Sequence, residues 1–316
     1  MKATALLGDI ASILRLHIIA IAVMAALAFS RMLVGELHVT VALLGGLDWL
    51  LINLLNRVSD VKEDIANQIR GTERLVGKHR LVLGAWVALL AASIAVGHVV
   101  APELTIVRLG VQLVGVGYSY PIVPAWHRGK LALARFKDLY FFKNFMSAAL
   151  FVTTCIAYPL LVAAGAASPA SGGVAFAAGM SWDSVIALVA FFVPFEITYE
   201  ILYDLRDLDG DRLAGVPTYP VVHGVETSVR IIDALLVAAA ATLLLAVFRG
   251  ALGVRELLMV LAPVLQVVFY KPRYRRGLTS GDCIALTWIG AGLLGVWLAG
   301  TALWVGAGLP ENVFLR

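Results

Sequence analysis

The sequence is poor in charge and in cysteine. Charged residues fill only 15% of its 316 positions, whereas they fill roughly a quarter of an ordinary soluble protein. The two cysteines, Cys155 and Cys283, both lie in apolar stretches, so no disulfide framework is indicated. The sequence also contains no CxxC or HExxH pattern, and it therefore gives no sign of a zinc site.

Long apolar runs make up most of the chain. Hydrophobic residues account for 60% of it, and apolar runs recur from Leu14 to Val305 with no block of soluble-protein composition between them. About 20 apolar residues are enough to cross the hydrocarbon core of a bilayer. The sequence therefore predicts an all-α polytopic membrane protein in which residues 1–316 form a single transmembrane domain. We interpret the run from Leu16 to Phe29 as a retained first helix, not a cleaved signal peptide, because it is long enough to span.

The basic residues predict the orientation of the protein. Most of the 25 lysines and arginines lie in loops on one side of the predicted helices, and such loops stay in the cytoplasm. We therefore expect the N-terminus and a central cavity to open to the cytoplasmic side. This placement also accounts for the net charge of +4 without a nucleic-acid partner. The predicted transmembrane helices are nine, near 14–33, 39–58, 81–100, 104–122, 140–164, 182–203, 229–248, 256–271 and 281–306.

Two acidic clusters end predicted helices on this same side. In the first cluster Asn56, Asp60 and Asp64 are spaced by four residues, so they share one helical face. An isolated carboxylate costs about 2.5–3.5 kcal/mol at the bilayer centre, so the clusters must line a wet cavity and bind cations. The second cluster, at the end of the sixth predicted helix, has a similar spacing and consists of Glu196, Glu200, Asp204, Asp207 and Asp211.

The ligand types indicate a hard divalent cation. Carboxylate and amide oxygens suit Mg2+, which uses one or two carboxylates together with phosphate oxygens. The sequence thus predicts Mg2+ as cofactor and a phosphate or diphosphate as ligand. Four nearby basic residues are candidates for neutralising the phosphoryl charge: Arg74, Lys130, Lys137 and Arg212. Three further loop carboxylates are interpreted as solvated residues that pair with the loop arginines: Glu63, Glu73 and Asp209.

These motifs resemble those of the UbiA-type intramembrane prenyltransferases. The family's NxxxDxxxD pattern is matched by Asn56, Asp60 and Asp64, and its DxxxD pattern by Asp207 and Asp211. The sequence departs from the family where Leu75, not proline, follows Arg74, and where the segment 122–134 is longer than usual. Further similarity lies in Arg74 after the first motif, in Arg212, Gly215, Thr218 and Pro220 after the second, in Tyr118-Ser-Tyr-Pro121, and in the stretch from Arg135-Phe-Lys137 through Lys143-Asn144.

The resemblance implies an enzyme of the cell membrane with its active site on the cytoplasmic side. It would transfer an isoprenyl group from a prenyl diphosphate donor to a lipophilic acceptor, with an aromatic acceptor favoured. Membrane lipids would surround both substrates. The resemblance implies Mg2+ ligands at Asp60, Asp64, Asp207 and Asp211 with Asn56 as their partner, diphosphate contacts at Arg74, Lys130, Lys137 and Arg212, and acceptor contacts or supporting roles for Glu200, Tyr203 and Asp204.

Other functions and roles stay open at this point. An intramembrane terpene cyclase would ionise the same donor, and a secondary transporter of an anionic metabolite would also place charges at helix ends. A CDP-alcohol phosphotransferase is disfavoured because Arg206 occupies the place of the first aspartate of its signature. Arg108 is either functional or extends to the membrane surface. Asp48 either prolongs the polar stripe or pairs with a neighbouring helix.

Overall fold

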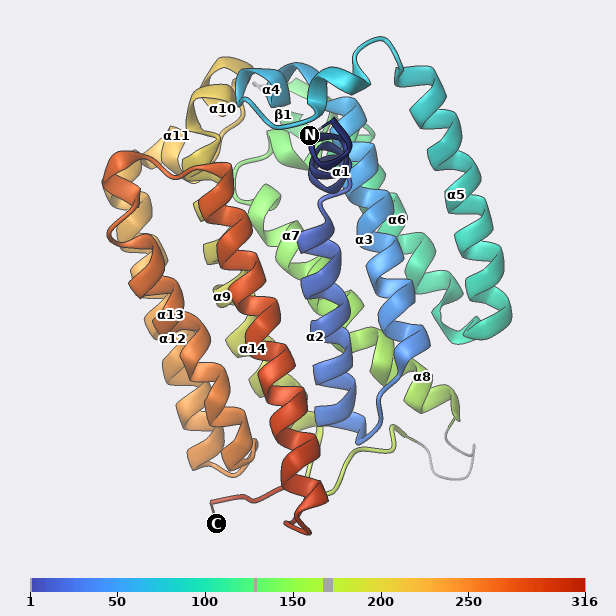
Figure 1. Ribbon diagram of the computed structural model, residues 1–316, viewed down its shortest axis with the longest axis vertical. Helices are drawn as coiled ribbons and strands as arrows, with labels where there is room; N and C mark the ends of the chain where they lie inside the picture. Colours follow the sequence, from blue (N-terminus) through green and yellow to red (C-terminus); the bar gives the residue numbers. More distant parts are fainter. Residues whose placement is uncertain (1, 128–129, 167–172, 316) are drawn as a thin grey trace.

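The structure, a computed structural model, describes residues 2–127, 130–166 and 173–315, with only the backbone at 2–5, 127 and 130. Long helices run side by side through most of its length (Figure 1). The helices are α1 (Lys2–Ile13), α2 (Leu16–Val34), α3 (Val39–Ser59), α4 (Val61–Ala66), α5 (His79–Val100), α6 (Thr105–Ser119), α7 (Phe142–Val152), α8 (Tyr158–Ala166), α9 (Trp182–Arg206), α10 (Leu208–Ala214), α11 (Tyr219–His223), α12 (Val225–Phe248), α13 (Leu261–Tyr270) and α14 (Ser280–Gly306). Shorter elements are the strands β1 (Val123–His127) and β2 (Lys130–Ala134), the π-helical η4 (Thr153–Ala157), and the 3-10 helices η1 (Thr72–Leu75), η2 (Pro102–Leu104), η3 (Phe136–Asp138), η5 (Val254–Val260) and η6 (Tyr274–Arg276).

Seven helices in the described part of the chain are long and apolar enough to cross a membrane. They are α2, α3, α5, the continuous stretch from α7 to α8, α9, α12 and α14. The two other predicted spans, near 104–122 and 256–271, form shorter helices, α6 and α13, each preceded by a 3-10 turn. The prediction of a helical multi-pass membrane protein is confirmed, and the count of nine spans stays a prediction.

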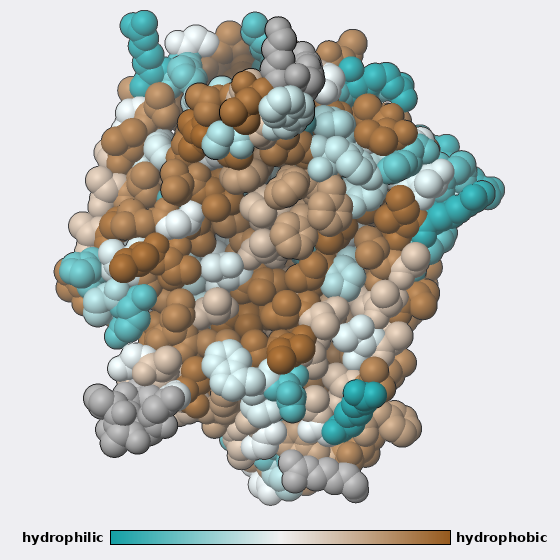
Figure 2. All heavy atoms as spheres, turned by 180° about the vertical axis from the view of Figure 1, so that it is seen from behind, coloured by the Kyte–Doolittle hydropathy of each residue, from teal (hydrophilic) through white to brown (hydrophobic). Residues whose placement is uncertain are grey.

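Apolar and small side chains hold the bundle together. Alanines of α2, among them Ala22, Ala25 and Ala28, are fully buried and let the neighbouring helices α3 and α14 approach closely. Phe29 of α2 meets Phe192 of α9 edge to face, with ring centroids 5.3 Å apart. On the outside, hydrophobic residues cover much of the middle of the rear face (Figure 2), as expected of a surface in contact with lipid.

Asp48 and Arg108 form a buried ion pair between α3 and α6. The Arg108 guanidinium donates to both carboxylate oxygens of Asp48 at 2.8 Å. Tyr158 and Gln112 donate to the same carboxylate at 2.9 Å. Because both ions are fully buried and fully partnered, Asp48 pairs with a neighbouring helix instead of prolonging the polar stripe, and Arg108 does not extend to the membrane surface.

The two ends of the bundle differ. The N-terminus, α4, α10, α11 and β1 gather at the upper end, whereas the C-terminus lies at the lower end (Figure 1). Within the segment 122–134, the strands β1 and β2 pair antiparallel, so that Val123 lies opposite Ala134. Hydropathy predicted neither this hairpin nor α1. Both short elements lie outside the predicted spans, where apolar periodicity carries no signal.

Candidate active site

Both acidic clusters lie where a long helix ends and a short one begins. α3 ends at Ser59 and α4 begins after Asp60, while α9 ends at Arg206 and α10 begins after Asp207. Helical hydrogen bonds nevertheless continue across each break. The backbone N–H of Asp64 donates to the carbonyl of Asp60 at 2.8 Å, and that of Asp211 to the carbonyl of Asp207 at 2.9 Å. The four-residue spacing therefore keeps each cluster on one face despite the change of helix.

A close contact between α10 and the end of α4 brings the two clusters together. The backbone N–H of Gly210 donates to the Asn67 side-chain oxygen at 3.1 Å. A Cβ atom at position 210 would lie only 2.2 Å from that oxygen, so the position accepts only glycine without a shift. The small residue inside the second motif thus allows the two acidic segments to meet across one cavity.

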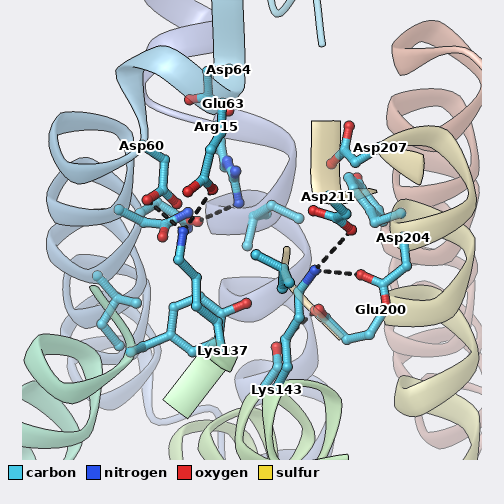
Figure 3. Close-up of a pocket in the computed structure, with 18 of the residues that line it drawn as sticks. Arg15, Asp60, Glu63, Asp64, Lys137, Lys143, Glu200, Asp204, Asp207 and Asp211 are labelled. Atoms are coloured by element: carbon cyan, nitrogen blue, oxygen red, sulfur yellow. Dashed lines mark hydrogen bonds and ion pairs between the residues drawn. The ribbon is translucent and has the colours of Figure 1, made fainter. Parts of the chain in front are cut away.

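The clusters form facing walls of a pocket of about 1010 Å3, the space at its open mouth included. Figure 3 shows Asp60 and Glu63 on one side and Asp204, Asp207 and Asp211 on the other, with two lysines reaching up between them. Ile18, Trp49, Ile52 and Leu150 make the remaining lining partly apolar. Nine predicted site residues line the pocket together: Asn56, Asp60, Asp64, Lys137, Glu200, Tyr203, Asp204, Asp207 and Asp211.

Each carboxylate of the first wall has a basic partner. Lys137, which is buried, places its Nζ 2.6 Å from Asp60 Oδ1 and 2.8 Å from Glu63 Oε2. Arg57 lies 2.6 Å from Asp64. Glu63, interpreted from the sequence as a solvated carboxylate that pairs with loop arginines, does lie 3.6 Å from Arg135, but it also lines the pocket and accepts from Lys137, 74 residues further along the chain. The exposed Glu73 and Asp209 do agree with that interpretation.

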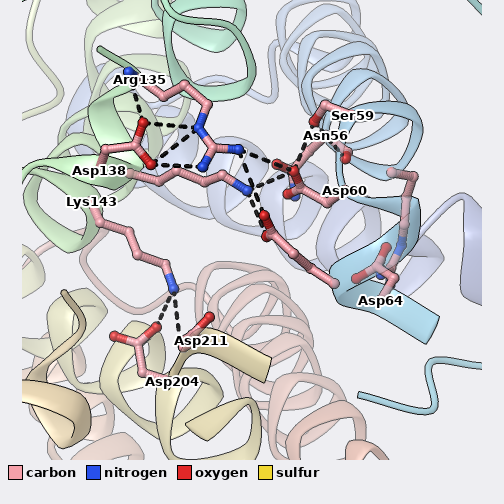
Figure 4. Close-up of polar contacts among 12 residues, drawn as sticks. Asn56, Ser59, Asp60, Asp64, Arg135, Asp138, Lys143, Asp204 and Asp211 are labelled. Carbon is pink, nitrogen blue, oxygen red and sulfur yellow. Dashed lines mark hydrogen bonds and ion pairs between the residues drawn. The ribbon is translucent and has the colours of Figure 1, made fainter. Parts of the chain in front are cut away.

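The lysine of the first wall is held by the hairpin and η3. Arg135 follows β2 and lies 2.7 Å from Asp138 (Figure 4). The two side chains close the short η3 turn, which contains Lys137. Burial tends to raise the pKa of Asp138, but the Arg135 guanidinium outweighs it and holds the pKa below its ordinary value. Asp138 is therefore ionised at neutral pH and keeps Arg135, which also lies 3.6 Å from Glu63, in place.

The second wall shares one lysine among several carboxylates. Lys143 of α7 lies 2.5 Å from Asp204 and 3.7 Å from Asp211. Asn144 donates to the other oxygen of Asp204 at 2.8 Å. Ser147, one turn further along α7, donates to Glu200 at 2.7 Å. The first turns of α7 therefore hold the carboxylates of α9 and α10.

Burial and charge act in opposite directions on the two aspartates of the second motif. Burial raises the pKa of Asp211 to about 6, although Lys143 partly opposes the shift. Asp207 is also buried, but an ion pair with its neighbour Arg206 holds its pKa below the ordinary value. Asp211 is thus the carboxylate of this motif that most lacks positive charge.

The structure adds basic residues that the sequence did not single out. Arg15 lines the pocket and donates to Asn53 at 3.3 Å. It has a left-handed backbone, with φ of 49°, at the break between α1 and α2. Nothing in the sequence signals this break, since glycine or asparagine usually occupies such a conformation. Arg206 lines the pocket as well, and only its place next to the second motif could have suggested it. Lys143, which belongs to a segment that resembles the family, also lines the pocket.

Two of the predicted diphosphate contacts, Arg74 and Arg212, are not brought to the pocket. Arg74 lies 2.7 Å from Asp9 of α1, and Arg212 is largely exposed and 3.8 Å from Asp209. The side chain of Lys130 lies outside the described residues. Of the four basic residues chosen from the sequence, Lys137 alone is seen to line the pocket, and the roles of the others stay predictions.

The donor atoms of the pocket suit Mg2+, although lysines now neutralise them. The buried Oδ1 of Asn56 and Oδ2 of Asp211 form no hydrogen bond. Oxygen donors of this kind fit a hard divalent cation. Among the described residues, no three histidine, cysteine, aspartate or glutamate side chains converge closely enough to hold a metal ion. A metal would have to draw carboxylates away from Lys137 and Lys143.

Comparison with known proteins agrees with this geometry. A model of the UbiA prenyltransferase family matches residues 17–281. The chain belongs to this family. The predicted family is thereby confirmed, and with it the enzyme class, because UbiA family members are prenyltransferases. No curated protein matches the chain.

Solved structures of UbiA homologues share the fold. A homologue from Archaeoglobus fulgidus, bound to DMAPP and Mg2+, is 17% identical with a TM-score of 0.65, the match covering 91% of this chain and 96% of that one. An apo homologue from Aeropyrum pernix K1 is 16% identical with a TM-score of 0.61, covering 90% and 98%. At such identities the likeness establishes the UbiA fold.

Proposed function

We propose that this UbiA family prenyltransferase transfers an isoprenyl group from a prenyl diphosphate to a lipophilic acceptor inside the membrane, with Mg2+ as cofactor. The observation that carries the proposal is the pair of carboxylate walls with Lys137 and Lys143 between them (Figure 3), in a pocket whose remaining lining is partly apolar. The charged part of the lining suits a diphosphate, and the apolar part suits a hydrocarbon tail. The homologues bound to DMAPP or GPP with Mg2+ support this proposal.

The cations of the pocket would bind the diphosphate. Lys137, Lys143 and Arg15 already line it, and phosphate oxygens can replace the carboxylates as their partners. Asn56, Asp60, Asp64, Asp207 and Asp211 would hold Mg2+, directly or through water. When bound, Mg2+ supplies a Lewis acid that lowers the charge on the departing diphosphate. Arg74 and Arg212 would join only after leaving Asp9 and Asp209.

The acceptor would approach from the floor of the pocket. Glu200 lies there with one oxygen bound to Ser147, which leaves the other for the proton of an acceptor hydroxyl or aromatic carbon. Tyr203 lies one turn from Tyr199 on the same helix and donates to or accepts from Thr287 at 3.0 Å, so it helps to shape the floor. Both oxygens of Asp204 are engaged by Lys143 and Asn144, so its role is to position Lys143.

The test is product analysis with purified protein in lipid nanodiscs. The protein is incubated with Mg2+, allylic prenyl diphosphates of several lengths and a host lipid extract. We expect pyrophosphate release that chelator abolishes, together with a lipid product that carries the prenyl mass. A cyclic hydrocarbon or alcohol formed without acceptor would assign the cyclase activity instead. Absence of pyrophosphate with every donor, in folded protein, would refute both.

We also propose that the protein lies in the cell membrane with the pocket facing the cytoplasm, as the basic loops indicate. The native cysteines are buried, so single cysteines can be placed at exposed Leu213, near the pocket, and at Leu309, near the C-terminus. In spheroplasts, a membrane-impermeant maleimide should label position 309 and leave position 213 unlabelled until the cells are lysed. The reverse pattern would invert the orientation.

A further inference from the structure

The two-stranded sheet of β1 and β2 exposes an apolar face. Cross-strand partners lie on the same face of a sheet, and the register pairs Trp126 with Leu131 and Pro124 with Leu133. Trp126 is 75% exposed, Leu131 70% and Leu133 64%, and Pro124 is exposed as well. These four apolar side chains therefore form one outward face of the sheet.

The opposite face of the sheet packs on the bundle. Ala134 is buried, and Val123 lies against the end of α6, where a Cβ atom at Gly117 would be 3.2 Å from Val123 Cγ2. The same Cβ atom would lie 2.9 Å from Phe136 Cε2 of η3. The sheet is thus fixed to the bundle by one face and presents the apolar face away from it.

The apolar face lies close to the surface that contacts lipid. The membrane-spanning stretch from α7 to α8 begins at Phe142, soon after the sheet ends, and Phe141 and Phe142 are 46% and 45% exposed. The sheet lies at the upper end of the bundle (Figure 1), and hydrophobic residues extend from the middle of the rear face towards this end (Figure 2). We therefore expect the sheet to lie at the level of the lipid headgroups.

The composition of the face favours lipid over water. Tryptophan is enriched where a bilayer meets water, because its ring is amphipathic. Elements that lie in this interface bury an apolar face at the boundary between headgroups and acyl chains, and they bind more tightly as the buried apolar area grows. In water the same face would promote aggregation. Lipid is available to it without any protein partner.

The sheet leads directly to the first wall of the pocket. β2 ends at Ala134, and Arg135 and Asp138 then close the η3 turn that contains Lys137. The Nζ of Lys137 lies 2.6 Å from Asp60 Oδ1. Whatever holds the sheet therefore also limits the movement of Lys137.

We propose that the sheet of β1 and β2 is a membrane anchor. Its apolar face, formed by Pro124, Trp126, Leu131 and Leu133, inserts between the lipid headgroups and thereby holds η3 and Lys137 in place. The partner is the bilayer surface, not a single bound lipid. The anchor is a property of the fold that the transfer reaction does not require.

Fluorescence quenching measures the depth of this face. Leu131→Cys, Ala132→Cys and Leu133→Cys each receive an environment-sensitive NBD label in nanodiscs whose phospholipids carry a nitroxide near the headgroup end of one acyl chain. The native cysteines are buried. We expect the nitroxide to quench the labels at 131 and 133 several-fold more strongly than the label at 132, because Ala132 is exposed on the opposite face.

Two other patterns would overturn the anchor. Weak and equal quenching at the three positions, with emission typical of water, would place the whole sheet in solvent. Blue-shifted emission at 131 and 133 without quenching would show that a protein, such as a second copy of this chain, covers the face instead of lipid.

A variant tests the same point by removing apolar area. Leu131→Asp, read with the label at position 133, should lower the quenching several-fold, whereas Leu131→Met is the matched control and should retain it. Because Leu131 is largely exposed, we expect both variants to fold, and size-exclusion chromatography checks this. Unchanged quenching in Leu131→Asp would refute the anchor.

The link to Lys137 has a separate readout, which rests on the donor binding proposed above. Leu131→Asp should raise KM for the prenyl diphosphate several-fold in nanodiscs, and Leu131→Met should leave it unchanged. An unchanged KM in Leu131→Asp protein that has lost its contact with lipid would reject the link to Lys137. The quenching needs no turnover, so strong quenching in a protein that releases no pyrophosphate would retain the anchor and reject prenyl transfer.

Discussion

The two walls of the first pocket are built from similar motifs but are neutralised differently. The three carboxylates of the first wall face three basic residues: Asp60, Glu63 and Asp64 against Arg57, Arg135 and Lys137. The four carboxylates of the second wall share two: Glu200, Asp204, Asp207 and Asp211 against Lys143 and Arg206.

The difference indicates where a divalent cation contributes most. The first wall is balanced without metal, whereas the second wall keeps an excess of negative charge and contains Asp211, whose pKa burial raises to about 6. A carboxylate that lacks a cation gains most when one binds. We therefore expect the second wall to bind Mg2+ more tightly and to depend on it more for stability.

The largest expected effect is on turnover. Asp60→Asn and Asp211→Asn should each lower the rate of pyrophosphate release by roughly 10²-fold or more, because an oxygen donor to the charge-stabilising metal is lost. If the second wall depends on Mg2+ more than the first, Asp211→Asn also raises the Mg2+ concentration for half-maximal rate more than Asp60→Asn does. Titration of turnover with Mg2+ measures this. Near-wild-type turnover in either variant would remove that residue from the site.

The next largest effects are expected from replacing the two lysines, which should differ in their effect on the stability of the metal-free protein. Lys137→Ala should weaken donor binding roughly 10- to 100-fold, the loss of a charge-assisted hydrogen bond. Lys143→Ala should do the same and also destabilise the metal-free protein by about 3–5 kcal/mol, because buried Asp204 and Asp211 lose their shared cation. Thermal unfolding in chelator and then in Mg2+ measures both, and Mg2+ should restore much of the loss in Lys143→Ala. Equal destabilisation by the two variants would contradict the difference between the walls.

A smaller effect is expected where the walls are joined. Gly210→Ala would force Asn67 away and should cost about 1–3 kcal/mol of stability, with turnover reduced several-fold. Gly84→Ala on α5 is the control, since a Cβ there meets no atom within 4 Å and alanine favours a helix. Chemical denaturation compares the two. A Gly210→Ala protein as stable as Gly84→Ala would show that this contact does not hold the walls together.

The smallest effect is a pH dependence of the metal-free protein. The pKa of Asp211 is raised from an unfolded value near 3.8 to about 6, so the protonated form is preferred in the folded state. The stabilisation from this proton is complete below about 3.8 and is lost as the pH rises through about 6. In chelator, the melting temperature of the wild type should therefore fall between pH 5 and pH 7 relative to that of Asp211→Asn. If the melting temperatures of the two proteins change with pH in parallel, the pKa of Asp211 does not lie in this range.

The sequence predicted the residues whose role depends on local spacing. Asn56, Asp60 and Asp64 line one pocket because four-residue spacing survives the break between α3 and α4. Hydropathy predicted the long spans for a similar reason, because the apolar composition of a span is a property of one continuous segment.

The residues that it missed depend on distant or irregular contacts. The partner of Glu63 comes from η3, and the left-handed backbone of Arg15 has no sequence signature. Arg74 was assigned to the diphosphate from its place after the first motif, and its contact with Asp9 of α1 could not be predicted because the two residues lie 65 positions apart. Such contacts become visible only when the segments are placed in space.

The measurement that tests the account most directly is pyrophosphate release from an allylic prenyl diphosphate by wild-type protein and by two variants, one from each wall. The account predicts Mg2+-dependent release by the wild type, stopped by chelator and nearly absent in both Asp60→Asn and Asp207→Asn. Release that persists unchanged in either variant, with the protein shown to be folded, would contradict a single site shared by the two walls.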